Sequence, residues 1–308
     1  MPLDPKAKEL LDEVNASGRP NAHLLPVPEA RANFEALFAS LGTGEEVADV
    51  RDLSIPVSGA TILARAYRPA GGGPFPVVAY YHGGGWLLGS IDAYDIVCRA
   101  LVNASGAIVV SVGYRLAPEH RFPAAVEDAY NATRWIAENA GDLGGDRNRV
   151  GIAGDSAGGN LAAVVALQAR DLTRPRLAFQ LLVYPVTTCD LDAGFDMAYE
   201  GYFLYRDELQ WHQDNYLATP ELASDWRVSP LEAAHHAGLP PALVITAECD
   251  PLHRQGELYA EKLRAAGVDV AHREYAGMIH GFFGLDMVFD RAGEAMRDAA
   301  EALRTALA

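Results

Sequence analysis

The sequence has few cysteines and no long apolar run. Its three cysteines, Cys98, Cys189 and Cys249, show no C-x-x-C spacing. An odd number of cysteines in a chain of this size predicts free thiols in a reducing compartment rather than a disulfide framework. No segment approaches the ~20 apolar residues of a membrane-spanning helix, and the first residues lack the apolar stretch of a signal peptide. We therefore expect a cytoplasmic protein without stable membrane association.

Basic residues are also scarce. The chain has 25 Lys and Arg against 41 Asp and Glu, which gives a net charge of −16. Such a surface repels nucleic-acid backbones and anionic lipids, so nucleic-acid binding is not expected. No His, Cys or carboxylate cluster has the spacing of metal ligands, and we expect neither a metal nor an organic cofactor. With 308 residues, half of them hydrophobic, the chain can bury one large core.

The segment Gly154–Asn160 contains the pattern G-x-S-x-G around Ser156. Residues 149–153 before it are apolar like a buried strand, and residues 161–167 after it are rich in Ala and Leu like a helix. A serine in a sharp strand-to-helix turn projects its hydroxyl into a cleft, and the flanking glycines make room for the turn. Taken alone, the pattern also fits an ordinary glycine-rich turn or an anion site at a helix N-terminus.

A second glycine-rich segment, His82–Trp86, follows the apolar residues 76–81. Three consecutive glycines leave backbone N–H groups uncovered, so the loop can donate to an oxygen that becomes negatively charged during a reaction. A nucleotide-binding loop would end in Lys-Ser/Thr, which this loop lacks. We expect His82 to hold the loop by a backbone hydrogen bond. Four residues are the candidates for an oxyanion hole: Gly83, Gly84, Gly85 and Ala157.

An acid and a histidine complete the chemistry. Residues 242–248 form an expected strand, and Asp250 stands where it ends; Glu248, two residues earlier, competes with it. His280 lies in the loop after the next expected strand, whereas the other histidines precede the acid, lie inside a strand or, like His253, follow the acid by three residues. The order Ser156, Asp250, His280 is that of an α/β-hydrolase triad, in which the acid orients the histidine.

With these motifs and the segment Tyr114–Ala124, the chain resembles the hormone-sensitive-lipase-like family of α/β-hydrolases, the bacterial family IV esterases, from about residue 47 almost to the C-terminus. The resemblance implies a mainly parallel eight-stranded sheet with helices on both faces and a helical cap. The strands are expected at 47–57, 61–68, 77–81, 107–113, 149–154, 177–184, 242–248 and 268–274. The sequence departs from the family pattern at one place. The family often has acidic residues soon after the catalytic acid, whereas this chain has His253–Gly256 there. The sequence therefore does not indicate which hydrogen bonds surround the acid.

Residues 5–40 show the apolar spacing of two helices, and residues 186–240 interrupt the alternation of strands and helices. We therefore predict N-terminal cap helices over 1–45, a core of 46–185 and 241–308, and an inserted helical cap segment over 186–240. The candidate substrate-binding residues are Trp86, Asp155, Tyr184, Phe203 and Ile279. For Asp155, a structural role in the serine turn is the favoured interpretation.

The resemblance implies a serine carboxylic-ester hydrolase for small esters with short or medium acyl chains. Two alternatives stay open: an amide or lactone hydrolase or acyltransferase that uses the same triad, and a catalytically silent ligand receptor on the same scaffold. A receptor of that kind would have lost its histidine, whereas His280 is present. The sequence leaves open the natural ester, the stereochemical preference and whether the chain is a monomer or a homo-oligomer.

Overall fold

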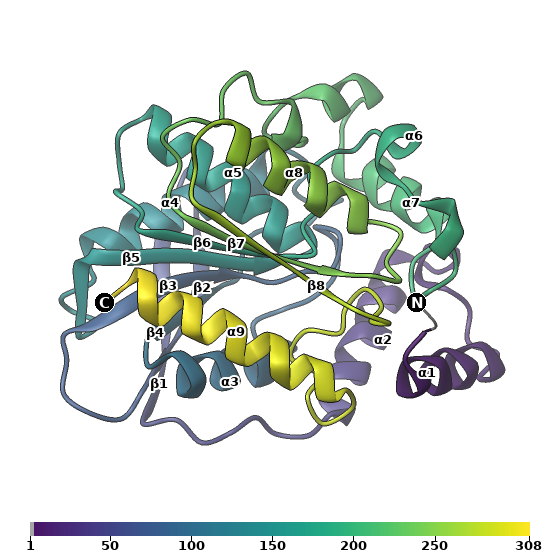
Figure 1. Ribbon diagram of the computed structural model, residues 1–308, viewed down its shortest axis with the longest axis horizontal. Coiled ribbons are helices and arrows are strands. Elements are labelled where there is room, and N and C mark those ends of the chain that lie inside the picture. The colour runs from purple at the N-terminus through teal and green to yellow at the C-terminus, as the bar shows by residue number, and fades with distance from the viewer. Residues whose placement is uncertain (1–2) are drawn as a thin grey trace.

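The computed structural model describes residues 3–308, which are built around an eight-stranded sheet (Figure 1). The strands are β1 Asp49–Val57, β2 Ala60–Arg68, β3 Phe75–Tyr81, β4 Ile108–Val112, β5 Gly145–Asp155, β6 Phe179–Val183, β7 Ala242–Ala247 and β8 Val270–Tyr275. Their order across the sheet is β1-β2-β4-β3-β5-β6-β7-β8. β1 and β2 form an antiparallel hairpin, β2 pairs antiparallel with β4, and the strands from β3 to β8 are parallel.

All eight expected strands are confirmed, with small differences at their ends. The largest is in β5, which begins at Gly145 rather than at residue 149. Gly145 pairs with Phe75 across an irregularity in the β3–β5 ladder. A register shift of this kind leaves no trace in the alternation of apolar residues, so the sequence did not indicate the extension.

Helices cover both faces of the sheet. They are α1 Pro5–Ala16, α2 Val27–Ser40, α3 Asp95–Ser105, α4 Ala124–Glu138, α5 Ala157–Asp171, α6 Leu191–Gly194, α7 Arg206–Tyr216, α8 His253–Ala265 and α9 Asp290–Ala306, with short 3₁₀ turns η1 Ala22–Leu24, η2 Met197–Tyr199, η3 Pro220–Ser224 and η4 Pro230–Glu232. In Figure 1, α4, α5 and α8 lie above the sheet, and α3 and α9 lie below it. The expected α/β architecture is therefore present.

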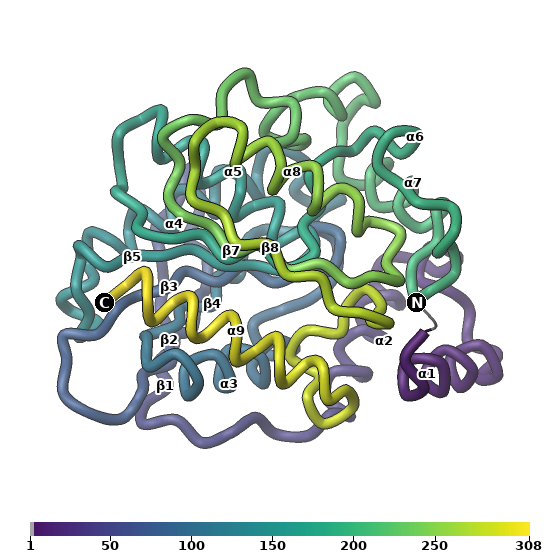
Figure 2. The backbone as a smooth tube through the Cα atoms, in the orientation of Figure 1, coloured from purple at the N-terminus to yellow at the C-terminus, as the bar shows by residue number. Residues whose placement is uncertain are grey.

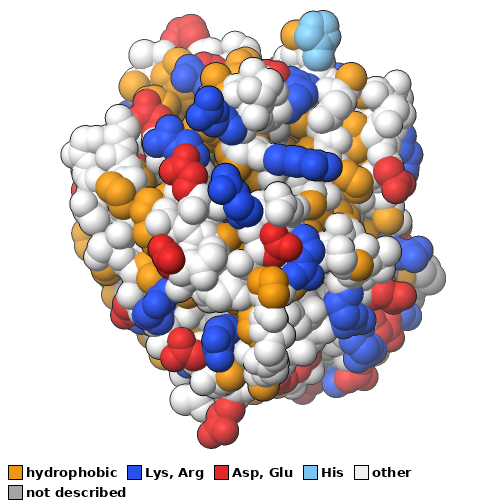
Figure 3. Space-filling view, turned by 90° about the vertical axis from the view of Figure 1, so that its left-hand side faces the viewer, with side chains coloured by type: hydrophobic (Ala, Val, Ile, Leu, Met, Phe, Trp, Pro, Cys, Tyr) orange, Lys and Arg blue, Asp and Glu red, His pale blue; other side chains and the backbone are white. Residues whose placement is uncertain are grey.

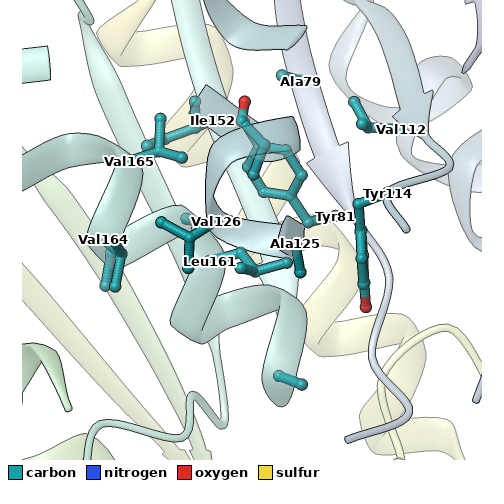
Figure 4. Close-up of a cluster of buried hydrophobic side chains, with 14 of the residues drawn as sticks. Ala79, Tyr81, Val112, Tyr114, Ala125, Val126, Ile152, Leu161, Val164 and Val165 are labelled. Atoms are coloured by element: carbon teal, nitrogen blue, oxygen red, sulfur yellow. The ribbon is translucent and has the colours of Figure 1, made fainter. Parts of the chain in front are cut away.

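Strand β3 shows how this architecture produces two cores. Val77, Ala79 and Tyr81 point into the core under α4 and α5, and Val78 and Tyr80 point into the core with α3 and α9. All five side chains are fully buried. Figure 4 shows the first core, where Tyr81 lies among residues of α4 and α5. A central parallel strand buried on both faces reads as a continuous apolar run, which is why residues 76–81 were identifiable as a strand.

Two helical segments far apart in the sequence lie beside each other. Residues 5–40 supply α1, η1 and α2, and residues 191–232 supply helices and turns from α6 to η4. Figure 2 shows α1 and α2 of the first segment and α6 and α7 of the second on the right-hand side, and η1 contacts α7 directly. This is also the end of the sheet where β5 leads into Ser156. The two segments therefore meet near the serine turn.

The opposite end of the molecule presents a different surface. Figure 3 shows this face, where the C-terminus and the amino end of β5 lie, and many Lys and Arg side chains gather on it. The net charge of −16 is thus unevenly distributed over the surface. Among residues 3–308, no helix is long and apolar enough to cross a membrane.

Candidate active site

Ser156 lies in a tight turn between β5 and α5. Its backbone has φ 55° and ψ −119°, a conformation that costs a non-glycine residue about 1–3 kcal/mol. Its N–H donates to the carbonyl of Val183 at 2.9 Å, which ties the turn to the neighbouring strand. A Cβ at Gly158 would run into the carbonyl of Tyr81 and lie 2.6 Å from that of His82. The second glycine of the motif is therefore required by the close approach of β3 to α5.

The structure brings Ser156, His280 and Asp250 into one hydrogen-bond chain. His280 Nε2 lies 2.9 Å from Ser156 Oγ, and His280 Nδ1 lies 2.8 Å from Asp250 Oδ2. The other carboxylate oxygen of Asp250 accepts the N–H of Leu252 at 2.8 Å, and the side chain is fully buried. This bonding fixes the carboxylate, and through it the orientation of the imidazole.

The competing side chains have other contacts. Glu248 accepts the N–H of Gly277 at 2.8 Å. His272 bonds Thr246 at 2.8 Å across β7 and β8, and His253 Nδ1 lies 3.0 Å from the backbone carbonyl of Asp250. Among the described residues, His280 is the histidine whose ring is hydrogen-bonded to Ser156.

The segment His82–Trp86 forms a loop beside Ser156 with two glycines in left-handed conformations, Gly84 at φ 105° and Gly85 at φ 61°. The carbonyl of Gly84 accepts the N–H groups of Leu87 and Leu88 at 3.1 and 2.8 Å, which closes the turn. Within residues 3–308, the N–H groups of Gly84, Gly85 and Ala157 have no hydrogen-bond acceptor. They are therefore available to a bound group.

Hydrogen bonds of His82 stabilise this loop. Its Nδ1 lies 2.8 Å from the carbonyl of Gly83, and the hydroxyl of Tyr114 donates to the carbonyl of His82 at 2.7 Å. Burial lowers the pKa of His82 to about 4, so the ring is neutral near pH 7 and its Nδ1–H donates to Gly83. The expected backbone hydrogen bond of His82 is present.

Asp155 lies beneath the same loop rather than in a pocket. It accepts hydrogen bonds from Tyr80 Oη at 2.8 Å, Tyr94 Oη at 2.9 Å and the N–H of Gly83 at 3.1 Å. Burial raises its pKa to about 6, and the two tyrosine hydrogen bonds oppose that rise. With only 4% of its surface exposed, Asp155 joins the serine turn to the glycine loop, which is the structural role favoured from the sequence.

The other candidate substrate-binding residues have different surroundings. Trp86 is buried and stacks on Tyr216 with ring centroids 4.4 Å apart. The ring of Tyr184 packs 4.6 Å from that of His280, and Ile279 lies in the core shared with α9. Phe203 is 37% exposed and lies against Gly281, next to His280. Of these four side chains, Phe203 is the exposed one.

One arginine of the N-terminal segment was not identified from the sequence. Arg31 on α2 donates to the carbonyls of Leu87 and Ala117, both at 2.7 Å, and pairs with both carboxylate oxygens of Glu119 at 2.9 and 2.7 Å. Leu87 belongs to the turn that Gly84 opens. Arg31 therefore connects α2 to the glycine loop.

The sequence left open which hydrogen bonds form near Asp250, and the structure shows that Gln255 makes several of them. Its side-chain oxygen accepts the N–H groups of Thr187 and Thr188 at 2.8 and 3.1 Å, and its nitrogen donates to Gly194 at 3.0 Å. The residue is fully buried. The amide thus attaches the start of the 186–240 segment to the helix that follows the acid. A carboxylate could accept the same two N–H groups but could not donate to Gly194.

Comparison with known proteins places this geometry in a family. Residues 78–284 match the family model described as alpha/beta hydrolase fold. The chain is 38% identical to the ethyl acetate hydrolase of Pseudomonas putida, with 99% of each chain covered, and 41% identical to the carboxylic ester hydrolase LipN of Mycobacterium tuberculosis, with 90% of this chain and 76% of LipN covered. A hyperthermophilic esterase from the archaeon Pyrobaculum calidifontis superposes with a TM-score of 0.93 at 41% identity over 99% of both chains. The chain belongs to the α/β-hydrolase fold family, in the hormone-sensitive-lipase-like branch that its motifs resemble.

Proposed function

We propose that this protein is a serine carboxylesterase that hydrolyses small esters with short or medium acyl chains. The observation that carries the proposal is the hydrogen-bond chain from Ser156 Oγ through His280 to Asp250. The names of the relatives, which include an ethyl acetate hydrolase and a carboxylic ester hydrolase, support the same chemistry.

In the proposed reaction, His280 Nε2 takes the proton of Ser156 Oγ as the oxygen attacks the ester carbonyl. Asp250 accepts the Nδ1–H of His280, which holds the correct tautomer and stabilises the imidazolium. His280 then gives its proton to the leaving alcohol, and an acyl group remains on Ser156. Water attacks this acyl-enzyme with the same help from His280, and the acid is released.

The oxyanion of each tetrahedral intermediate needs donors beside Ser156. We assign this role to the N–H groups of Gly84, Gly85 and Ala157, which have no acceptor among the described residues. The N–H of Gly83 already donates to Asp155, so Gly83 shapes the loop. Removing one donor of an oxyanion hole typically costs about 3–4 kcal/mol of transition-state stabilisation.

We further propose that residues 1–45 and 186–240 act as a cap over this site, with residues 46–185 and 241–308 as the catalytic core. The contact between η1 and α7, and that of Phe203 with Gly281 beside His280, support this division. A roof of packed helices limits the space for the acyl chain, whereas each methylene that fits adds about 0.8 kcal/mol of burial. The rate should therefore rise over the first few carbons and then fall.

The test is a series of p-nitrophenyl esters of increasing acyl length, assayed with the wild type and Ser156→Ala, together with labelling by a fluorophosphonate. We expect hydrolysis with a short-chain optimum, and labelling that the substitution abolishes. A folded wild type that neither hydrolyses the esters nor reacts with the probe would refute the proposal and favour a ligand receptor.

A further inference from the structure

The triad and the glycine loop leave several polar groups near the site unused. Three of them come from the proposed cap: Glu208 and His212 on α7, and His23 on η1. Glu208 and His212 are four residues apart, so they lie on one face of the helix. These two titratable side chains have no assigned role in ester hydrolysis.

His212 places this face of α7 directly over the glycine loop. Its ring packs against Gly85 so closely that a Cβ there would overlap the imidazole. The side chain is 6% exposed, and its Nδ1 is buried without a hydrogen-bond partner among residues 3–308. Burial lowers the pKa of His212 to about 4, so this imidazole is neutral at neutral pH.

Glu208 lies one turn earlier on α7 and is half-buried. Within the described chain, its side chain makes no hydrogen bond or ion pair. Burial raises its pKa to about 7, and a charge on His280 opposes the rise, so the carboxyl group is electrostatically coupled to the histidine of the triad. Arg206, the cation nearest in sequence, instead bonds Asp192 and the carbonyl of Leu191.

His23 brings a third unpaired group from the other helical segment. Its Nδ1 is also buried without a partner among the described residues, and its ring lies 6.4 Å from that of Tyr205 just before α7. η1 contacts α7 directly, so His23 lies on the element packed against the helix that carries His212. Where η1 meets α7, unpaired polar atoms thus converge from two elements.

The charge on these three side chains indicates which kind of ligand they would bind. Burial lowers the pKa of His212, so its imidazole is neutral at alkaline pH, and Glu208, whose pKa is about 7, then carries a negative charge. A half-buried carboxylate without a partner is unfavourable, and a ligand with a positive charge lowers that cost. We propose that Glu208, His212 and His23 form a subsite that selects esters carrying an organic cation, such as a trimethylammonium group. The inference rests on the proposed ester hydrolysis and adds a substrate class to it.

The experiment compares esters that differ only in this charge. One pair is acetylcholine and the acetate ester in which a tert-butyl group replaces the trimethylammonium group. The other is the ethyl ester of γ-(trimethylammonio)butyric acid and its tert-butyl analogue. The first pair places the cation on the alcohol and the second on the acyl chain. The measured quantity is the ratio of kcat/KM for the charged ester to that for its neutral analogue, at about pH 8.5, where carboxyl groups are ionised.

Glu208→Gln is the test variant, and Asp207→Asn is the matched control, since Asp207 is the exposed neighbour on the same helix and its substitution removes the same charge. We expect the wild type to favour the cation in at least one pair. We expect the ratio to fall at least about fivefold in Glu208→Gln, the size of a partly screened ion pair, and to be unchanged in Asp207→Asn. The pair that responds identifies the side of the ester that faces α7.

A ratio that Glu208→Gln leaves unchanged would overturn the inference. An equal fall in both variants would also overturn it, because it would show an effect of the overall negative charge. Failure of the proposed function looks different: the wild type would then hydrolyse neither member of a pair. Hydrolysis of the neutral esters without a preference for the cation refutes the subsite alone.

Discussion

The connection that Arg31 makes between α2 and the glycine loop leads to a quantitative prediction for Arg31→Ala. The substitution removes two hydrogen bonds to the carbonyls of Leu87 and Ala117 and an ion pair with Glu119. Hydrogen bonds from a charged donor contribute about 1.5–3 kcal/mol each, and an ion pair with a half-exposed partner at most about 1 kcal/mol. The Arg31 side chain is 26% exposed, so water reaches part of the vacated space. We therefore expect a loss of about 2–4 kcal/mol in the free energy of unfolding.

The same substitution should lower kcat. Leu87 lies in the turn that begins at Gly84, so loss of its anchor loosens the backbone that presents the proposed oxyanion donors. Complete loss of one donor costs about 10²–10³ in kcat, and loosening should cost about tenfold, with KM nearly unchanged because the effect concerns the transition state. Denaturant unfolding and steady-state hydrolysis of a p-nitrophenyl ester measure the two effects.

Glu119→Gln is the control for this prediction. It removes the charge of the partner but keeps the two bonds from Arg31 to backbone carbonyls. It should therefore cost less than about 1 kcal/mol and leave kcat unchanged. If Arg31→Ala matches this control in stability and in kcat, the argument is wrong. A loss of stability without a change in kcat would show that Arg31 anchors α2 but does not position the loop.

Four more substitutions test the proposed reaction and the serine turn. Ser156→Ala should abolish labelling by a fluorophosphonate and leave the unfolding midpoint almost unchanged; labelling that persists would place the nucleophile elsewhere. Asp250→Asn should lower kcat by about 10⁴-fold because the amide favours the wrong tautomer of the histidine. Glu248→Gln should change kcat only severalfold, and the reverse ranking of the two variants would move the acid two residues upstream. Gly158→Ala should destabilise the fold by at least about 1–3 kcal/mol, because its Cβ would overlap the carbonyl of Tyr81; a denaturation midpoint equal to that of the wild type would refute this packing argument.

The sheet could be predicted because each strand carries its own local signal. Residues 76–81 and 242–245 are continuous apolar runs, as expected for parallel strands covered on both faces. The early start of β5 was missed because Gly145 and its neighbours are not apolar, and their pairing depends on the opposite strand. Strand existence is thus encoded locally, whereas strand length also depends on the partner.

The residues of the hydrogen-bond chain could be named from the sequence for a related reason. A serine in a sharp turn and a loop of uncovered N–H groups both require glycine at fixed positions, so the backbone requirement is visible in the sequence. Asp155 has no such signature. Its contacts with Tyr80 and Tyr94 come from side chains more than sixty residues away. The sequence therefore favoured a structural role for Asp155 but did not indicate these two partners.

The contacts of the two helical segments with the site carry neither the apolar signal of a buried strand nor the glycine signal of a tight turn. Arg31 and His212 look like surface residues of amphipathic helices, and their contacts with the glycine loop arise only where α2 and α7 meet it. The hydrogen-bond chain and the glycine loop belong to the sheet and its loops, whose geometry tolerates little change because carbonyls and glycines are in direct contact. On α7, His212 shares that constraint because its ring packs against Gly85, whereas the exposed Asp207 does not. Under the proposed function, the core would determine which bond is broken, and the helical segments would determine which ester reaches it.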